Sequence, residues 1–105
     1  MTVIEQLQAA RGLIERGWCQ GEFAKTADGR AIAPSSDFAH SWCVMGACVR
    51  AKISSVESNY LRFIYAALPD NYHTVAAFND APGRTQAEIL KLFDDAIELA
   101  KAGEA

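Results

Sequence analysis

The stretch that decides the fold is Trp42-Cys43-Val44-Met45-Gly46-Ala47-Cys48-Val49, the longest run of apolar and glycine residues in the chain. Apolar side chains on a wide arc are typical of a helix that is buried on more than one side. Ser35 or Ser36 can cap such a helix, with Asp37 in its first turn. We therefore predict a central buried helix from this cap to Ile53. Its buried face would comprise Phe38, Trp42, Met45, Gly46, Val49 and Ile53.

The start of this stretch has a short counterpart earlier in the chain, Trp18-Cys19-Gln20-Gly21. Polar and apolar residues alternate after Trp18, and Asp28-Gly29 is a strong turn signal before the return segment 30–33. We predict a small two-stranded hairpin near residues 18–33, with an ordered loop as the alternative. A two-stranded hairpin is marginal alone, so it should lie on the helices.

The flanking helices have clear start and stop signals. We predict a helix over residues 3–16, because Thr2 and Glu5 have the spacing of a capping box and Gly17 suits a left-handed terminator. A last helix should run from Thr85, with Glu88 completing its capping box, to Gly103.

Two further helical segments are predicted between these. Ser54 or Ser55 should begin a helix that carries Val56, Tyr60, Phe63, Ile64 and Ala67 on one face, with Glu57 in a capping box. Pro69 should end it. A short helical piece should follow over residues 72–78. The predicted fold is mainly α (α+β): four to five helices around the central helix, with the small hairpin, in one globular domain over residues 1–105.

Composition excludes several classes of function. The net charge is −3 with no basic cluster, which does not favour nucleic-acid binding. The longest apolar run is far below the roughly 20 residues that a membrane span needs. We see no secretory signal and no Cys-x-x-Cys among the three cysteines, so we expect a cytosolic protein with free thiols. No phosphate-binding glycine motif is present, and we predict no cofactor.

The first candidate site surrounds Trp42. On a helix, His40 and Cys43 would share a face, and imidazole and thiolate are ligands that zinc prefers. Cys19 could supply a third ligand, and His73 or Asp80 a fourth. Structural zinc sites usually carry a tight ligand pair, which this chain lacks. The simpler interpretation makes Cys19 and Cys43 buried apolar residues and His40 a surface residue.

The same residues allow a thiol nucleophile, Cys43 or Cys19, activated by His40. We expect Cys43 to lie about two turns into its helix, too deep for the helix-start amides to lower its pKa. Trp18 and Trp42 could line a pocket, but we interpret them as core residues. Each buried indole N–H then needs an acceptor, either a backbone carbonyl or a side chain such as Asn79.

The second candidate site is the turn Asn79-Asp80 with Arg84 and Thr85, where an amide, a carboxylate, a guanidinium and a hydroxyl precede a helix. This arrangement suits an anion or a small ligand. The structural alternative is that Asn79 and Asp80 form turn contacts, Arg84 pairs with Asp80, and Thr85 caps the last helix.

These segments together resemble a family of small bacterial and phage proteins of unknown function, DUF6197. The residues that carry the resemblance are 18–21, 28–29, 39–47, 78–80, 84–85, 88–90, 96–97 and 100. In the family pattern Trp is common where this chain has Phe78, and Cys19 is not a fixed position, which argues against Cys19 as a required ligand or nucleophile. The resemblance implies no activity.

We therefore hypothesise a non-enzymatic accessory domain that binds a protein partner or a small ligand in a groove between the hairpin and the Asn79–Arg84 turn. The ligand-binding candidates are Trp18, Trp42, Cys43, Asn79, Asp80 and Arg84. The alternative is a small hydrolase or metal-dependent enzyme centred on His40, Cys43 and Asp80. The chain could be a monomer, or a homodimer through Tyr60, Phe63 and Tyr65.

Overall fold

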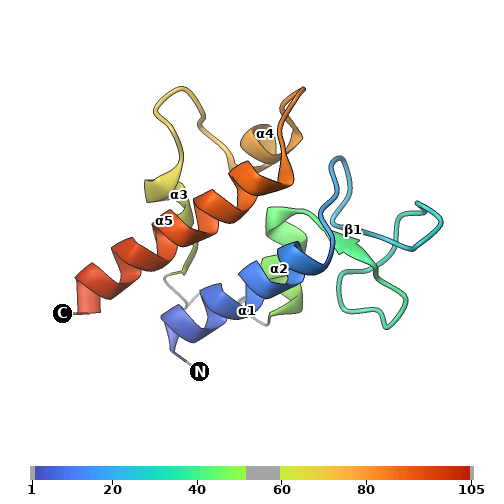
Figure 1. The fold of residues 1–105 in the computed structure, drawn as a ribbon, viewed down its shortest axis with the longest axis horizontal. Helices are drawn as coiled ribbons and strands as arrows, with labels where there is room; N and C mark the ends of the chain where they lie inside the picture. Colours follow the sequence, from blue (N-terminus) through green and yellow to red (C-terminus); the bar gives the residue numbers. More distant parts are fainter. Residues whose placement is uncertain (1, 52–59, 105) are drawn as a thin grey trace.

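The computed structural model describes residues 2–51 and 60–104. These residues form five helices and one two-stranded antiparallel sheet, so the predicted mainly α fold is confirmed (Figure 1). The elements are α1 (Val3–Arg16), β1 (Ala24–Lys25), β2 (Ser41–Trp42), α2 (Val44–Arg50), α3 (Tyr60–Ala67), α4 (Val75–Asp80) and α5 (Gln86–Glu104).

The core lies where α1 and α5 run side by side in opposite directions, with α3 against α5 and α2 against α1 (Figure 1). Leu7 and Ile14 of α1 and Phe93 of α5 are completely buried in this core. Outside the core, Arg11 donates to Asp94 at 2.6 Å and ties α1 to α5. No helix among residues 2–51 and 60–104 is long and apolar enough to cross a bilayer.

Helix α1 has the bounds predicted from the sequence, and the capping box between Thr2 and Glu5 is present. The role predicted for Gly17 is wrong, because its φ of 178° is extended and not left-handed. Glycine is needed there for a different reason. A Cβ atom on Gly17 would lie 2.3 Å from the carbonyl oxygen of His40, so a side chain would push β2 away from the end of α1.

Helix α2 begins later than predicted. Its N-cap is Cys43, whose Sγ accepts from the amide of Gly46 at 3.3 Å, whereas Ser35 and Ser36 lie in turns. Phe38, predicted to be buried, is 77% exposed. The predicted helical residues before Cys43 belong to turns and to β2, because backbone pairing with a distant segment wins over the local helix pattern.

The backbone of Trp42 provides that pairing. Its amide donates to the carbonyl of Gly17 at 3.0 Å, and its carbonyl accepts from Cys19 at 3.2 Å. Ile53 lies outside the described residues, as do the predicted start signals of the third helix: Ser54, Ser55, Val56 and Glu57.

The sheet pairs Ala24 with Trp42 and Lys25 with Ser41, so its second strand is β2 and not the predicted segment 30–33. The predicted turn is nevertheless present, with Gly29 at a φ of 86°. The return segment makes a bridge between Lys25 and Ala31. Strand β1 therefore pairs with β2 and, through Lys25, also contacts the return segment of the hairpin.

The C-terminal elements follow the predicted signals closely. Helix α3 ends before Pro69. Helix α4 is capped by Thr74 and lies slightly later than the predicted segment 72–78. Thr85 and Glu88 exchange the backbone bonds of a capping box at the start of α5. Helix α5 continues through Gly103 to Glu104, whereas we predicted that it ends at Gly103.

Candidate functional site

Asn79 on α4 is the centre of a buried hydrogen-bond network. Its side chain is only 1% exposed, and its Oδ1 accepts from the indole of Trp18 at 2.9 Å and from the amide of Val44 at 3.1 Å. Its Nδ2 donates to the carbonyl of Cys19 at 3.2 Å and to Asp80 Oδ1 at 2.8 Å. A carboxamide has two donors and two acceptor lone pairs, so Asn79 has no hydrogen-bonding capacity left for a ligand.

Neighbouring bonds extend this network to the loop after Trp18. Gln20 Nε2 donates to the carbonyls of Asn79 and Ala81, at 3.0 and 3.1 Å. The amide of Gly21 donates to Asp80 Oδ1 at 3.0 Å. The network therefore joins three segments that are far apart in the sequence: the first Trp-Cys pair, the start of α2 and the end of α4. The loop that carries Gly21 is held against α4 as a result.

Trp42 has a different environment from Trp18. It is 1% exposed, and its indole donates to the carbonyl of Pro34 at 3.0 Å. The guanidinium groups of Arg16 and Arg50 lie 5.4 and 5.9 Å from the centre of its ring. Both indoles therefore have the acceptors predicted from the sequence, and Trp42 is a core residue.

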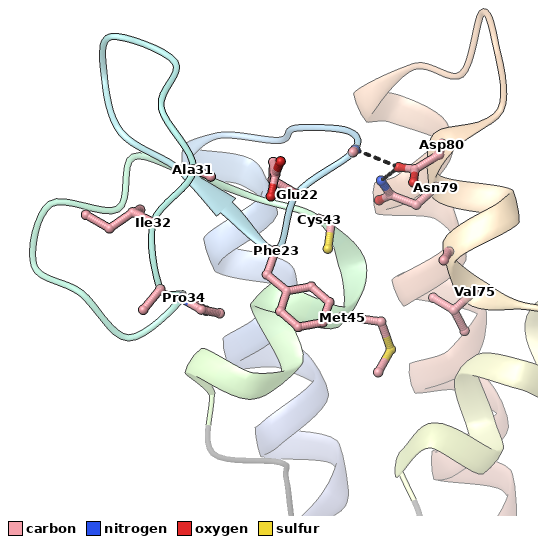
Figure 2. Close-up of a pocket in the computed structure, with 13 residues that line it drawn as sticks. Glu22, Phe23, Ala31, Ile32, Pro34, Cys43, Met45, Val75, Asn79 and Asp80 are labelled. Carbon is pink, nitrogen blue, oxygen red and sulfur yellow. Dashed lines mark hydrogen bonds between the residues drawn. The ribbon is translucent and has the colours of Figure 1, made fainter.

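A pocket of about 610 Å³ lies between the 21–34 segment and α4, with the start of α2 as its third wall. Figure 2 shows Phe23 and Met45 between these walls, with Val75 on the α4 side. Glu22 and Asp80 are the acidic residues of the lining. Its other members are Gly21, Ala31, Ile32, Ala33, Pro34, Cys43, Ala76 and Asn79.

The lining is thus mainly apolar, and its Phe23 side chain is 57% exposed. The backbone carbonyl of Phe23 accepts from the amide of Cys43 at 3.2 Å. A Cβ atom on Gly46 would lie 1.8 Å from the same carbonyl oxygen. The pocket wall therefore depends on a glycine in α2 that lets the two backbones touch.

The comparison with family models identifies one match, which covers residues 1–99 and is described as a family of unknown function, DUF6197. The chain belongs to this family. The comparisons with curated proteins and with solved structures found no match. The segments on which we based the resemblance include the three that the Asn79 network joins.

In this DUF6197 member, the pocket contains one thiol. Cys43 lies in the lining and is 8% exposed. Our prediction that it lies two turns into a helix is wrong, because it caps α2. Burial nevertheless raises the pKa of Cys43, against bonds from the amides of Gly46 and Met45 that lower it. The thiol is therefore kept protonated, which does not favour a nucleophile.

The candidate metal ligands do not form one group with His40. His40 precedes β2, is exposed and does not share a helix face with Cys43. Burial also raises the pKa of Cys19, which bonds weakly to the carbonyl of Glu22. Within residues 2–51 and 60–104, no three His, Cys, Asp or Glu side chains are grouped as metal ligands.

Arg84 does not line the pocket. Its Nε donates to the carbonyl of Phe78 at 2.8 Å, and its Nη1 donates to Glu88 at 2.9 Å. It also lies over the rings of Phe78 and Tyr72. The predicted pairing of Arg84 with Asp80 is therefore wrong, and only the Asn79-Asp80 part of the predicted turn borders the pocket.

The apolar lining residues were not among our predicted site residues. Phe23, Met45, Val75 and Ala76 follow the same patterns as ordinary core positions. One signal could have indicated that Phe23 is exposed. It follows Gly21 and Glu22 in a segment where polar and apolar residues alternate.

Proposed function

We propose that this chain is a non-enzymatic binding module whose pocket between the 21–34 segment and α4 takes the apolar part of a small ligand. The observation that carries the proposal is the pocket itself. Its volume of about 610 Å³ lies within the range of about 300–1,000 Å³ typical of small-molecule sites. Such sites are usually lined by apolar side chains with a few polar groups, as this one is.

Hydrogen bonds within the protein hold the walls of the pocket in place, so the site is preformed. The Asn79 network holds α4 to the loop at Gly21 and to the start of α2. A preformed site loses little conformational entropy when a ligand binds, which favours affinity. A cytosolic location, for which the three free cysteines are suited, is part of this proposal.

The enzymatic alternative has less support. Cys43 and Asp80 line the pocket, but His40 does not, so the proposed base is missing from the group. The homodimer through α3 stays a separate prediction, with Tyr65 47% exposed on that helix.

The test uses the neutral probe 1-naphthalenemethanol, whose two fused rings suit a pocket of this size. We expect saturable binding in an NMR titration, with shifts at Phe23, Ala31 and Ala76. Ala76→Phe should fill the pocket and weaken binding by about tenfold or more, a change of about 1.4 kcal/mol.

Ala77→Phe provides the matched control. Ala77 is exposed on the same helix but does not line the pocket, so this variant should bind the probe like the wild type. The proposal is contradicted if the probe does not bind, or if both variants bind it equally well.

A further inference from the structure

We propose that the pocket selects organic cations, small molecules with an apolar body and a protonated amine. This inference rests on the proposed function and adds the chemical class of the ligand. The apolar walls would take the body, and the carboxylates of Glu22 and Asp80 would take the ammonium group.

Charge is the first argument. Glu22 and Asp80 are the charged side chains of the lining, and both are exposed. No Lys, Arg or His is among the lining residues. An opening bordered by one sign of charge next to apolar walls attracts ligands of the opposite sign.

Two neighbouring cations are paired with other carboxylates. Arg84 pairs with Glu88 at 2.9 Å, and Arg30 pairs with Asp28 at 2.9 Å. Lys25 lies on β1, two residues beyond Phe23, and does not line the pocket. None of the ion pairs among residues 2–51 and 60–104 includes Glu22 or Asp80, so both carboxylates are available to a cation at the pocket.

The position of the Asp80 carboxylate is the second argument. Its Oδ1 accepts from the amide of Gly21 at 3.0 Å and from Asn79 Nδ2 at 2.8 Å (Figure 2). None of the hydrogen bonds among the described residues uses its Oδ2. The group is thus oriented by the network while one oxygen is left for a donor, and an ammonium group has three donors.

The ring of Phe23 is the third argument. It lines the pocket next to Glu22 in the sequence, and more than half of its surface is exposed, at 57%. The face of an aromatic ring attracts a cation electrostatically. An anion would gain nothing from this ring face and would be repelled by both carboxylates.

The experiment compares three probes with the same naphthalene body at pH 7: 1-naphthalenemethylamine, 1-naphthalenemethanol and 1-naphthoate. Dissociation constants are measured by NMR titration on the full chain. We expect the amine to bind about tenfold more tightly than the alcohol, and the naphthoate more weakly than both. Because both carboxylates are exposed, the preference should shrink as salt is raised from about 10 mM to 150 mM.

Variants that neutralise one carboxylate each test which residues cause the preference for the amine. Glu22→Gln and Asp80→Asn should each reduce the preference for the amine severalfold, and the double variant should abolish it. Asn at position 80 keeps an oxygen that can accept from Gly21. Glu98→Gln on α5 is the control, because it removes the same charge from a residue that does not line the pocket.

The outcomes separate the two proposals. If the amine and the alcohol bind equally well, ligand binding stands and cation selection is overturned. If the preference exists but survives in the double variant, the cation binds elsewhere and the inference is also overturned. If 1-naphthalenemethanol does not bind, the proposed function fails, and the inference that rests on it fails with it.

Discussion

Asn79 and Asp80 are neighbours on α4, yet their environments are opposite. The Asn79 side chain is 1% exposed, and all four of its hydrogen-bonding positions are used by bonds within the protein. Asp80 is exposed and lines the pocket. Most of the residues that stand out in the sequence, such as Trp18, Trp42 and Asn79, build a scaffold. The surface that could bind something is made beside it, largely from unremarkable apolar side chains.

We expect the largest loss of stability from a substitution at Gly46, where α2 touches the backbone of the pocket wall. Gly46→Ala would place a Cβ atom 1.8 Å from the carbonyl oxygen of Phe23, and backbone on both sides leaves little room to relax. We expect a loss of more than about 3 kcal/mol in the free energy of unfolding, measured by urea denaturation, or no folded protein.

Gly12→Ala is the matched control for that substitution. Gly12 lies inside α1, and nothing within 4 Å would meet its Cβ atom. Alanine should stabilise the helix by up to about 1 kcal/mol. Equal effects of the two alanines would contradict the close approach of α2 to the pocket wall.

The scaffold role of Asn79 predicts the next largest effect. Asn79→Ala would leave the Trp18 indole, the Val44 amide and the Cys19 carbonyl without this partner. At about 1–3 kcal/mol for each buried polar group, the loss should be at least about 3 kcal/mol in urea denaturation.

Asp80→Asn tests the adjacent residue, which we place at the pocket and not in the scaffold. It should change stability by less than about 1 kcal/mol, because the residue is exposed and an acceptor for Gly21 is retained. A stability loss at Asp80 as large as that at Asn79 would remove the distinction between scaffold and pocket.

The thiols predict how stability depends on pH. Burial raises the pKa of Cys48, which is fully buried in the core, and also that of Cys43 at the pocket. The unfolded chain ionises its thiols first, near pH 8.5, so stability is complete below that pH and falls as the pH rises toward the folded pKa. For Cys48 the slope should approach about 1.4 kcal/mol per pH unit.

Urea denaturation between about pH 8 and pH 10 measures this slope. Cys48→Ala should lower stability at neutral pH and make the remaining pH dependence flatter, because one buried thiol is removed. An unchanged slope in that variant would show that the buried thiol is not responsible.

The smallest effect on stability is expected on the pocket side. Phe23 is 57% exposed, so Phe23→Ser should change the free energy of unfolding by less than about 1 kcal/mol. The same variant should bind 1-naphthalenemethanol several times more weakly in the NMR titration. A large loss of stability with unchanged probe binding would show that Phe23 belongs to the scaffold and not to the binding surface.

Much of the fold could be predicted because its signals are local. The capping boxes at Thr2 and Thr85 and the apolar stripes behind them predict α1 and the start of α5 correctly. The start of α2 could not be predicted in this way. Ser35 and Ser36 look like caps, but Ser41 and Trp42 pair with β1 instead. The backbone of Trp42 also bonds to Gly17 and Cys19, which are distant in the sequence.

The candidate site was predictable only in part. Trp18, Asn79 and Asp80 were singled out, and the structure brings them together. Trp42 and Arg84 were also singled out, but neither lines the pocket, and both donate to backbone carbonyls. The apolar lining could not be recognised, because its side chains differ from core residues only in what the fold leaves uncovered.

The most direct test of this account is a ¹H–¹⁵N NMR titration of the wild-type chain with 1-naphthalenemethylamine. Binding in the pocket should shift the amides of Phe23, Ala31 and Ala76, while the side-chain amide of Asn79 and the indole N–H of Trp18 keep their hydrogen bonds and move little. Large shifts at the Asn79 amide and the Trp18 indole, with the pocket amides unmoved, would contradict it by making the network the binding site.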